Sequence, residues 1–428
     1  MKRIIRELRP FKKPLILIGI ILGMLLIFTQ VIPTIREMDA KKTPIVSISA
    51  KNGRTYERNE TIAASDFTIK AKHKSGKTSS VNADEVTLST TKPQRVGKYT
   101  TVEITLNANK KISTTVKVKN RREKIAEFEC GNPKKSDVKA VIYSNGELCF
   151  EGKGNVLQYE QGEFPWQDSS DDYTITAVSF EKDVMPISMD YWFEGMEELT
   201  YIAPLPESVQ SIVGMCTGCI SLKSAPEWSQ CTALLDATEA FYQCTALTKI
   251  PALPASLRNT TRMCADCGDL QTAPDMTSAT GLQNATEMFS GCKKLTQTST
   301  APNLETMDGM YQDCINLESM PSIPASVVSM ESTFSGATSL SKLQTIPPSV
   351  KNVTSCFEGC TKVSGELIVE CNPTDYSGFL TDAANATQLN LTGSSRYLEV
   401  LANTSENGNI LVNGKAPNPD VTSIDNEE

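Results

Sequence analysis

The sequence predicts a mainly β chain with short helical or irregular segments, in which one N-terminal transmembrane helix and a β-sandwich precede a solenoid of repeats. Three observations predict this fold class. One phrase recurs eight times between residues 192 and 363, residues 45–119 alternate in a Thr- and Val-rich pattern, and residues 15–32 carry no charge. A chain of 428 residues suggests about three domains of roughly 150 residues, although a solenoid lengthens without a single central core.

The repeated phrase sets the architecture. It consists of an aromatic residue or its substitute, two small or polar residues, a slot that is usually Cys, two spacers and an aliphatic residue, as in MFSGCKKL at 288–295. The slot falls at 196, 219, 244, 267, 292, 314, 337 and 360, in steps of 23, 25, 23, 25, 22, 23 and 23 residues. A fixed period in the twenties is typical of a solenoid, whose units bury their apolar faces only against each other.

Each repeat has two halves. The first half runs Cys-x-x-Leu-x-x-apolar, often followed by Pro, and predicts a short strand that proline ends because it has no N–H to donate. Stacked at about 4.8 Å per strand, eight such strands would form a parallel sheet roughly 35 Å long. The second half carries apolar residues such as Val327, Met330 and Phe334, which we expect to pack behind the sheet.

The N-terminus predicts a membrane anchor. Residues 1–13 hold six Lys and Arg, and the eighteen uncharged residues that follow would span about 27 Å as a helix, close to the roughly 30 Å of a bilayer core. We expect a cytoplasmic basic segment at 1–13, a transmembrane signal anchor at 14–34 and a linker at 35–44. The positive-inside rule then places the repeats outside a single-pass cell-membrane protein. Cleavage of the segment as a signal peptide stays open.

The segment 45–119 predicts a small antiparallel sandwich, because short alternating strands are separated by turns such as Lys51-Asn52-Gly53. The run VGKYT at 96–100 resembles part of the bacterial immunoglobulin-like domains of surface proteins. This resemblance implies a spacer role. Residues 44–120 carry fourteen Lys and Arg against six Asp and Glu, so contact with an anionic membrane or wall polymer is an alternative to a merely solvated basic surface.

The rest of the chain divides by composition. We expect a linker at 120–137, an N-terminal β cap of the solenoid at 138–190, about eight repeats at 191–363, a C-terminal cap at 364–412 and a disordered tail at 413–428. Terminal units of a solenoid must cover its open apolar ends.

The repeats resemble the BspA-like subclass of leucine-rich repeats, whose consensus is Cys-x-x-Leu-x-x-Ile-x-Leu-Pro. The runs at 288–295 and 244–254 match it closely, while Met196 and Ala337 replace Cys and Val363 replaces the final Leu. The resemblance implies a bacterial cell-surface protein that binds protein or host-matrix ligands without catalysis, as in adhesion. A structural or self-assembling envelope component is the alternative.

Charge and histidine content argue against several other classes of function. Residues 121–428 carry nineteen Lys and Arg against forty-one Asp and Glu, which argues against nucleic acid because binding it requires a basic face. His73, the one histidine, lies outside the repeats, so His-based metal sites and Ser-His or Cys-His pairs are excluded there. We expect no cofactor, no metal and no enzyme, since no constellation of residues supports catalysis.

The thirteen cysteines invite a metal or redox interpretation, because Cys216 and Cys219, and Cys264 and Cys267, form C-x-x-C pairs. Cys216 and Cys264 nevertheless occupy the slot that is aromatic in the other repeats. We therefore expect buried core cysteines, with a local disulfide or a metal site left open.

Ligand contacts are expected on the concave strand face, the usual binding surface of a solenoid. The candidate ligand-facing residues are Tyr201, Lys223, Lys249, Gln271, Glu318 and Lys342. They could equally be solvated surface. Asp168, Asp171 and Asp172 cluster in the cap but lack the spacing of a calcium loop. The sequence leaves the ligand, the organism and the oligomeric state open.

Overall fold

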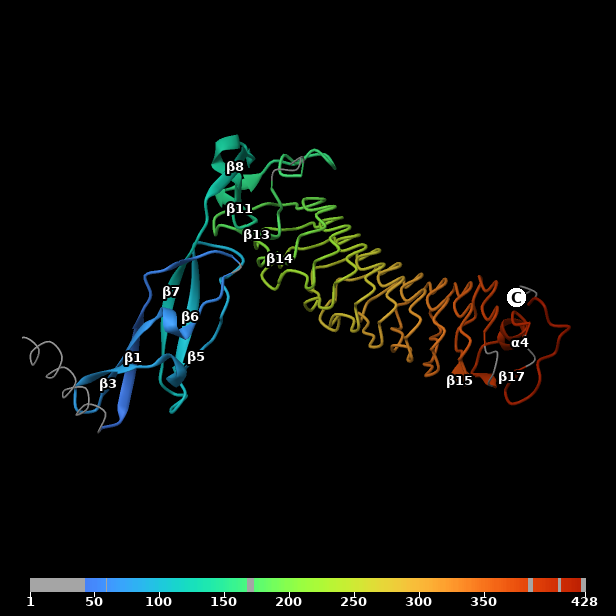
Figure 1. Ribbon diagram of the computed structural model, residues 1–428. Helices are drawn as coiled ribbons and strands as arrows, with labels where there is room; N and C mark the ends of the chain where they lie inside the picture. Colours follow the sequence, from blue (N-terminus) through green and yellow to red (C-terminus); the bar gives the residue numbers. More distant parts are fainter. Residues whose placement is uncertain (1–42, 59, 168–172, 384–387, 407–408, 425–428) are drawn as a thin grey trace, which may run out of the picture. The chain divides into compact units, whose positions relative to one another are not determined.

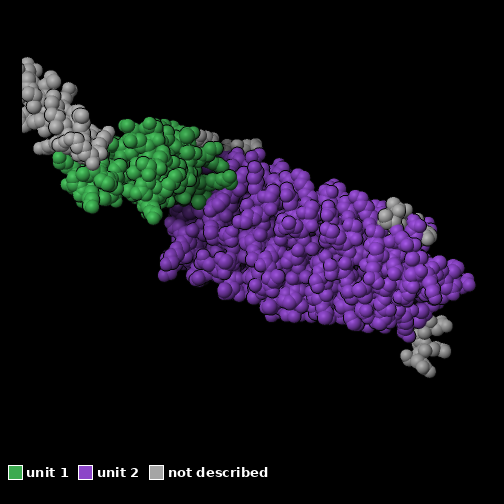
Figure 2. Space-filling model, turned by 90° about the horizontal axis from the view of Figure 1, so that it is seen from below, with its two compact units in different colours: residues 1–122 green, residues 123–428 purple. Residues whose placement is uncertain are grey.

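The computed structural model describes residues 43–58, 60–167, 173–383, 388–406 and 409–424 (Figure 1). The chain divides into two compact units, Met1–Arg122 and Glu123–Glu428, which Figure 2 colours separately. The first unit holds two small β-sheets. The second is a long row of short stacked coils (Figure 1).

Two sheets over one shared core make up the first unit. The strands are β1 (Ile45–Lys51), β2 (Thr55–Tyr56), β3 (Thr68–His73), β4 (Thr78–Val81), β5 (Val86–Leu88), β6 (Tyr99–Leu106) and β7 (Ser113–Asn120), with 3-10 turns η2 (Ala64–Asp66) and η3 (Ala83–Glu85). One sheet has the order β1-β3-β4 and the other β2-β7-β6-β5. Every second residue of β6 is buried, as a half-exposed sandwich strand requires, and the buried residues of both sheets form one cluster.

The predicted fold class is wrong in its N-terminal transmembrane helix. Within the described ranges, no helix is long and apolar enough to cross a membrane. The segments 1–13 and 14–34 lie outside those ranges, together with most of the linker at 35–44. We therefore correct the fold class to a mainly β chain, in which the described residues contain one short α-helix, α4 (Leu398–Ala402).

The second unit opens with a mixed sheet in the order β14-β13-β11-β10-β8. Its strands are β8 (Lys124–Glu129), β10 (Val138–Tyr143), β11 (Glu147–Gly152), β13 (Ala177–Phe180) and β14 (Tyr201–Ile202), beside the two-stranded sheet of β9 (Gly131–Asn132) and β12 (Asn155–Val156) and the turn η4 (Lys135–Asp137). The hairpin β10–β11 turns at Asn145-Gly146, where Gly146 takes a φ of 76°. From β11 onward the pairing is parallel, so the cap sheet leads directly into the coils.

The predicted linker at 120–137 is wrong, because β8, β9 and η4 occupy most of it. Strand β8 lies at the edge of the sheet and pairs with β10. Its residues are exposed or half-buried, so this stretch shows little of the apolar signal by which a strand is recognised.

A continuous column of parallel bridges runs through the coils on the side of the second half-repeat. Nine residues form it, each bridged to the next: Ser188, Ser211, Asp236, Asn259, Asn284, Thr306, Ser329, Asn352 and Asp375. We call this the ladder column and number positions in each coil from its ladder residue. Residues at position +1 donate their N–H to the ladder carbonyl of the next coil, as Val353 does to Asp375 at 2.8 Å.

Left-handed residues let each coil turn while it keeps this pattern. Position +3 has a positive φ in every coil, between 50° at Ser355 and 67° at Gly378, and in the eight coils before that of Asp375 its N–H donates to the +2 carbonyl of the next coil. Glycine adopts this conformation without strain, and other residues adopt it at a cost. Positions +5 and +7 also donate to the next coil, as Phe357 does to Phe379 at 3.0 Å and Gly359 to Thr381 at 2.8 Å, so the coils stack through several backbone hydrogen bonds each.

The predicted sheet of Cys-x-x-Leu strands is much less regular than the ladder column. Between 203 and 345, its described positions form only the isolated bridges Ser224–Lys249, Thr272–Gln297 and Ser319–Lys342. Prolines follow closely at 226, 251, 274 and 321, and they end each strand after one or two ladder bonds.

Buried aromatic and sulfur columns fill the coils. Phe289, Tyr311, Phe334 and Phe357 are fully buried and stack with ring centroids 5.6–5.7 Å apart. Cys216 and Cys264 occupy the same position, +5, in their coils and are also fully buried, as the repeat alignment predicts. Offset stacking adds to the free energy gained by burying these rings.

The coils continue beyond residue 363. Strands β15 (Gly365–Ile368), β16 (Leu389–Thr392) and β17 (Ile410–Val412) pair in parallel, and α4 lies between the last two in sequence. The predicted disordered tail at 413–428 is wrong for its described part, since Asn403 Nδ2 donates to the Asn418 and Val421 carbonyls and Ile424 packs on the core. Polar composition hid these contacts, because they are made mostly by backbone groups.

Candidate functional site

The structure brings the six candidate residues to one side of the coils. Tyr201 lies in β14, and each of the other five stands at one of the two positions just after the buried Leu of its repeat. Tyr201, Lys249 and Lys342 stand two residues after that Leu. Lys223, Gln271 and Glu318 stand one residue after it. We call this side the strand edge.

Backbone hydrogen bonds hold the strand edge in register. The Lys223 carbonyl accepts the N–H of Thr248 at 3.0 Å, the Gln271 carbonyl that of Thr296 at 3.0 Å, and the Glu318 carbonyl that of Ser341 at 3.1 Å. Because their main-chain groups are engaged between coils, the side chains project outward from a fixed backbone.

The strand edge is exposed and polar. Tyr201 is half-buried and the other five side chains are exposed. Within the described part of the chain, Lys223, Lys249 and Lys342 form no ion pair. Their neighbours Ser224, Thr272 and Gln297 are also exposed. The edge therefore presents hydrogen-bond donors and acceptors to solvent, together with lysines that have no ion-pair partner among the described residues.

The cysteines have a structural role. All thirteen are free and buried, and slot thiols donate to the carbonyl at the aromatic position of the preceding coil, as Cys219 Sγ does to Phe193 at 3.1 Å and Cys360 Sγ to Phe334 at 3.0 Å. Burial raises the pKa of Cys360 to about 12 and that of Cys231 to about 11. Such thiols stay neutral and unreactive at ordinary pH.

No metal centre is formed where the C-x-x-C pairs suggested one. Among the residues that can be described, no group of three or more His, Cys, Asp or Glu is arranged to hold an ion. Asp168, Asp171 and Asp172 lie outside those residues. His73 is buried in the first unit, where its ring nitrogens contact the Thr43 carbonyl at 2.6 Å and Ser79 Oγ at 2.8 Å.

An ionic row on the ladder side was missed by the sequence reasoning. Arg262 Nη1 lies 2.8 Å from Glu239 Oε1, and Arg262 Nε lies 3.4 Å from Glu287 Oε2. All three residues occupy position +3 of successive coils, and the guanidinium also lies over the Tyr242 ring at 4.4 Å. Their sequence spacing of 23 and 25 residues matches the repeat period, which was the available signal.

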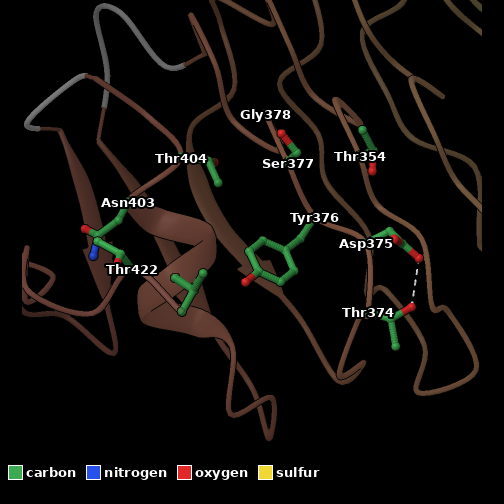
Figure 3. Close-up of a pocket in the computed structure, with 10 residues that line it drawn as sticks. Thr354, Thr374, Asp375, Tyr376, Ser377, Gly378, Asn403, Thr404 and Thr422 are labelled. Carbon is green, nitrogen blue, oxygen red and sulfur yellow. Dashed lines mark hydrogen bonds between the residues drawn. The ribbon is translucent and has the colours of Figure 1, made fainter. Parts of the chain in front are cut away.

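A polar hollow of about 510 Å³ lies at the end of the ladder column. Figure 3 shows Tyr376 between the last coil, with Thr374 and Asp375, and the segment carrying Asn403 and Thr404. The other lining residues are Thr354, Ser377, Gly378, Val400 and Thr422. Its walls are mostly hydroxyl and amide groups, with no arrangement of acid, base and nucleophile.

Comparisons with known proteins place the repeats in a family. The model of the BspA type leucine rich repeat region matches residues 170–296 and 285–375, in six copies. No curated protein matches the chain. The match lies in the repeats, and the resemblance of residues 45–119 to immunoglobulin-like domains has no support from any comparison.

Among solved structures, a leucine-rich repeat protein from Bacteroides ovatus is similar at 17% identity and a TM-score of 0.37, covering 66% of this chain and 80% of that one. A leucine-rich repeat protein from Eubacterium ventriosum is similar at 14% identity and a TM-score of 0.28, covering 57% of this chain and 90% of that one. The repeat period, the buried slot residues and the family match agree: residues 170–375 form a leucine-rich repeat region of the BspA type.

Proposed function

We propose that this chain is a non-catalytic recognition protein that binds protein or host-matrix ligands outside the cell through the strand edge. Repeat proteins of this family are interaction modules, and solenoids bind along the surface that successive repeats share. The observation that carries the proposal is that Lys223, Lys249 and Lys342 are exposed on the strand edge, have backbone groups bonded between coils, and form no ion pair in the described part of the chain.

The chemistry of the edge suits an acidic or amide-rich partner surface. Three lysines would meet carboxylates or sulfates, while Gln271 and Glu318 would bind peptide groups between them. Tyr201 adds a half-buried aromatic ring at one end, the kind of residue that often contributes most to binding at interfaces.

The test compares two triple charge reversals in the full chain. Lys223→Glu, Lys249→Glu and Lys342→Glu change the strand edge, and Lys182→Glu, Lys293→Glu and Lys351→Glu change exposed lysines elsewhere in the same unit. Binding to immobilised collagen, laminin and fibronectin is measured by surface plasmon resonance. We expect the first triple to weaken binding at least about tenfold, since losing each rim charge costs a fraction of a kcal/mol or more, and the second to change it little.

Three results contradict the proposal. Equal loss in both triples would mean that net charge, and not the strand edge, drives binding. Absence of binding by the unaltered chain to the matrix panel, together with stable homo-oligomers in analytical ultracentrifugation, would favour the structural or self-assembling alternative. Repeats that resist external protease on intact cells, and are cleaved only after lysis, would contradict an extracellular position.

A further inference from the structure

The ladder column ends in an unfinished backbone edge. In every earlier coil, the −1 carbonyl accepts an N–H from the next coil, and the +1 and +3 N–H groups donate to it. Lys351, Val353 and Ser355 do so toward the coil of Asp375 at 2.8 Å each. In that last coil, the Thr374 carbonyl and the N–H groups of Tyr376 and Gly378 have no hydrogen-bond partner among the described residues.

The cap that follows covers only the neighbouring position. Thr404 Oγ1, just after α4, accepts the N–H of Leu380 at 2.9 Å and so replaces the carbonyl that a further coil would supply at +4. Positions −1 to +3 instead face the hollow of about 510 Å³ (Figure 3). One acceptor and two donors are therefore left in the order that a parallel strand pairs with.

We propose that this edge, the residues 374–378, binds an extended peptide segment of a partner protein as an added parallel strand. The peptide's first residues donate to the Thr374 carbonyl, and its carbonyls two residues apart accept from Tyr376 and Gly378. Strand addition of this kind takes its affinity from main-chain hydrogen bonds and its specificity from alternate side chains. The inference rests on the proposed function for the kind of partner and adds a second contact site.

The preceding coils define the side chains that the added strand carries. Position +1 is buried in the eight earlier coils, where it is Met, Ile, Ala, Thr or Val. Positions 0 and +2 of these coils are half-buried, except for the exposed Glu331, and are mostly Ser, Asn, Asp or Thr. An added strand would set its +1 side chain against Tyr376 and Val400, which line the hollow. The fitting segment is therefore polar–aliphatic–polar, such as the Asn-Val-Thr that the chain itself has at 352–354.

A second copy of the chain fits less well than a free segment. Its matching coil would be the first, around Ser188, but cap residues already contact that coil on both flanks. Asn155 Oδ1 accepts the Ile187 N–H at 3.2 Å, and Trp166 Nε1 donates to the Trp192 carbonyl at 2.8 Å. The cap thereby occupies the space that a docking coil needs.

The experiment uses the full chain and the peptide Ac-Lys-Asn-Val-Thr-Ser-NH2, which copies residues 351–355. Amide hydrogen exchange is followed at Tyr376 and Gly378, with the already bonded Val353 and Ser355 as reference. We expect the peptide to slow exchange at Tyr376 and Gly378 only.

Two N-methylated peptides form the matched pair. Methyl groups on the Lys and Asn nitrogens remove the donors to Thr374, and we expect about tenfold weaker binding, the effect of roughly one hydrogen bond. Methyl groups on the Val and Ser nitrogens, which would point away from the edge, should leave affinity unchanged. Equal weakening by both, or unchanged exchange at Tyr376 and Gly378, overturns the proposal.

Two further outcomes separate this site from the strand edge. Peptide binding that survives the Lys223, Lys249 and Lys342 reversals supports an independent end site, even where matrix binding fails and overturns the proposed function. Slow exchange at Tyr376 and Gly378 in concentrated protein without peptide, together with dimers in ultracentrifugation, would mean that a second copy of the chain binds this edge. That result would overturn the proposal of a partner peptide.

Discussion

At each end of the coil stack, backbone groups lack a neighbouring coil to pair with. The flanking segment at the first end replaces that coil at more positions than the segment at the last end. At the first ladder coil, the side chains of Asn155 and Trp166 replace an absent preceding coil at two positions, and a mixed sheet extends the stack beyond it. At the last ladder coil, Thr404 covers Leu380 alone, and the edge at 374–378 faces a hollow. A repeated backbone pattern therefore does not decide how it ends. The flanking segments decide that by the reach of a few polar side chains.

The largest expected effect comes from alkaline pH, which should destabilise the whole coil stack between the two ends. Burial raises the pKa of Cys130 to about 12 and of Cys371 to about 11, and it also raises the pKa of the slot cysteines Cys244, Cys267 and Cys292. The unfolded chain loses thiol protons first, so the free energy of unfolding falls once pH exceeds about 8.5, by about 1.4 kcal/mol per pH unit for each such thiol.

Urea unfolding at pH 7.5 and pH 10 measures this effect. Residues 44–120 contain no Cys, so the transition of the first unit is the internal control and should move much less. Equal shifts of both units would mean that groups other than the buried thiols govern alkaline stability.

The next largest effect should come from removal of the Trp166 side chain, which covers the first end of the coil stack. This side chain is fully buried, with ring centroids 5.0 Å from Phe150 and 5.4 Å from both Phe164 and Trp192. Trp166→Ala should lower the free energy of unfolding of the second unit by about 3–5 kcal/mol, because it leaves a cavity and an unpaired Trp192 carbonyl. Denaturant unfolding measures it. A loss below about 1 kcal/mol would mean that the cap does not stabilise the coils.

The smallest effects lie at the other end. Thr404→Val keeps the shape but removes the acceptor of the Leu380 N–H, and should cost about 1–3 kcal/mol. Ser377→Ala is the control, because this exposed side chain lines the hollow without a bond in the stack, and should stay within about 0.5 kcal/mol.

Hydrogen exchange sharpens this last comparison. In Thr404→Val, the Leu380 amide should exchange as fast as those of Tyr376 and Gly378. If all three amides are equally protected in the unaltered chain, the edge at 374–378 is not open and the contrast between the two ends disappears.

The sequence predicted the repeat architecture because the fixed spacing between equivalent residues is visible without knowledge of the fold. Slot spacing placed the buried Cys, aromatic and Leu positions correctly, and the aromatic alignment explained Cys216 and Cys264 as core residues. It also placed Lys249 and Lys342 at equivalent positions of their repeats and Lys223 one residue away, since residues a whole number of repeats apart occupy equivalent positions. Whether they bind a ligand stays a prediction.

The features missed have a common cause. Ladder residues are Ser, Asn, Asp and Thr, which look like loop in a pattern search, and their role depends on bonds to residues 22–25 positions away. Strand β8 and the tail at 413–424 were misassigned for a similar reason, because partners distant in sequence hold them.

By itself, the sequence determined the period, the buried slots and the side of the coil that faces solvent, because these depend on side-chain polarity repeated at fixed intervals. The tertiary structure alone decided which half of each coil carries the continuous ladder, and that this ladder stops at Asp375 with donors unpaired. Every residue contributes the same backbone N–H and C=O whatever its side chain, so only the stacking of neighbouring coils shows which of these groups find partners.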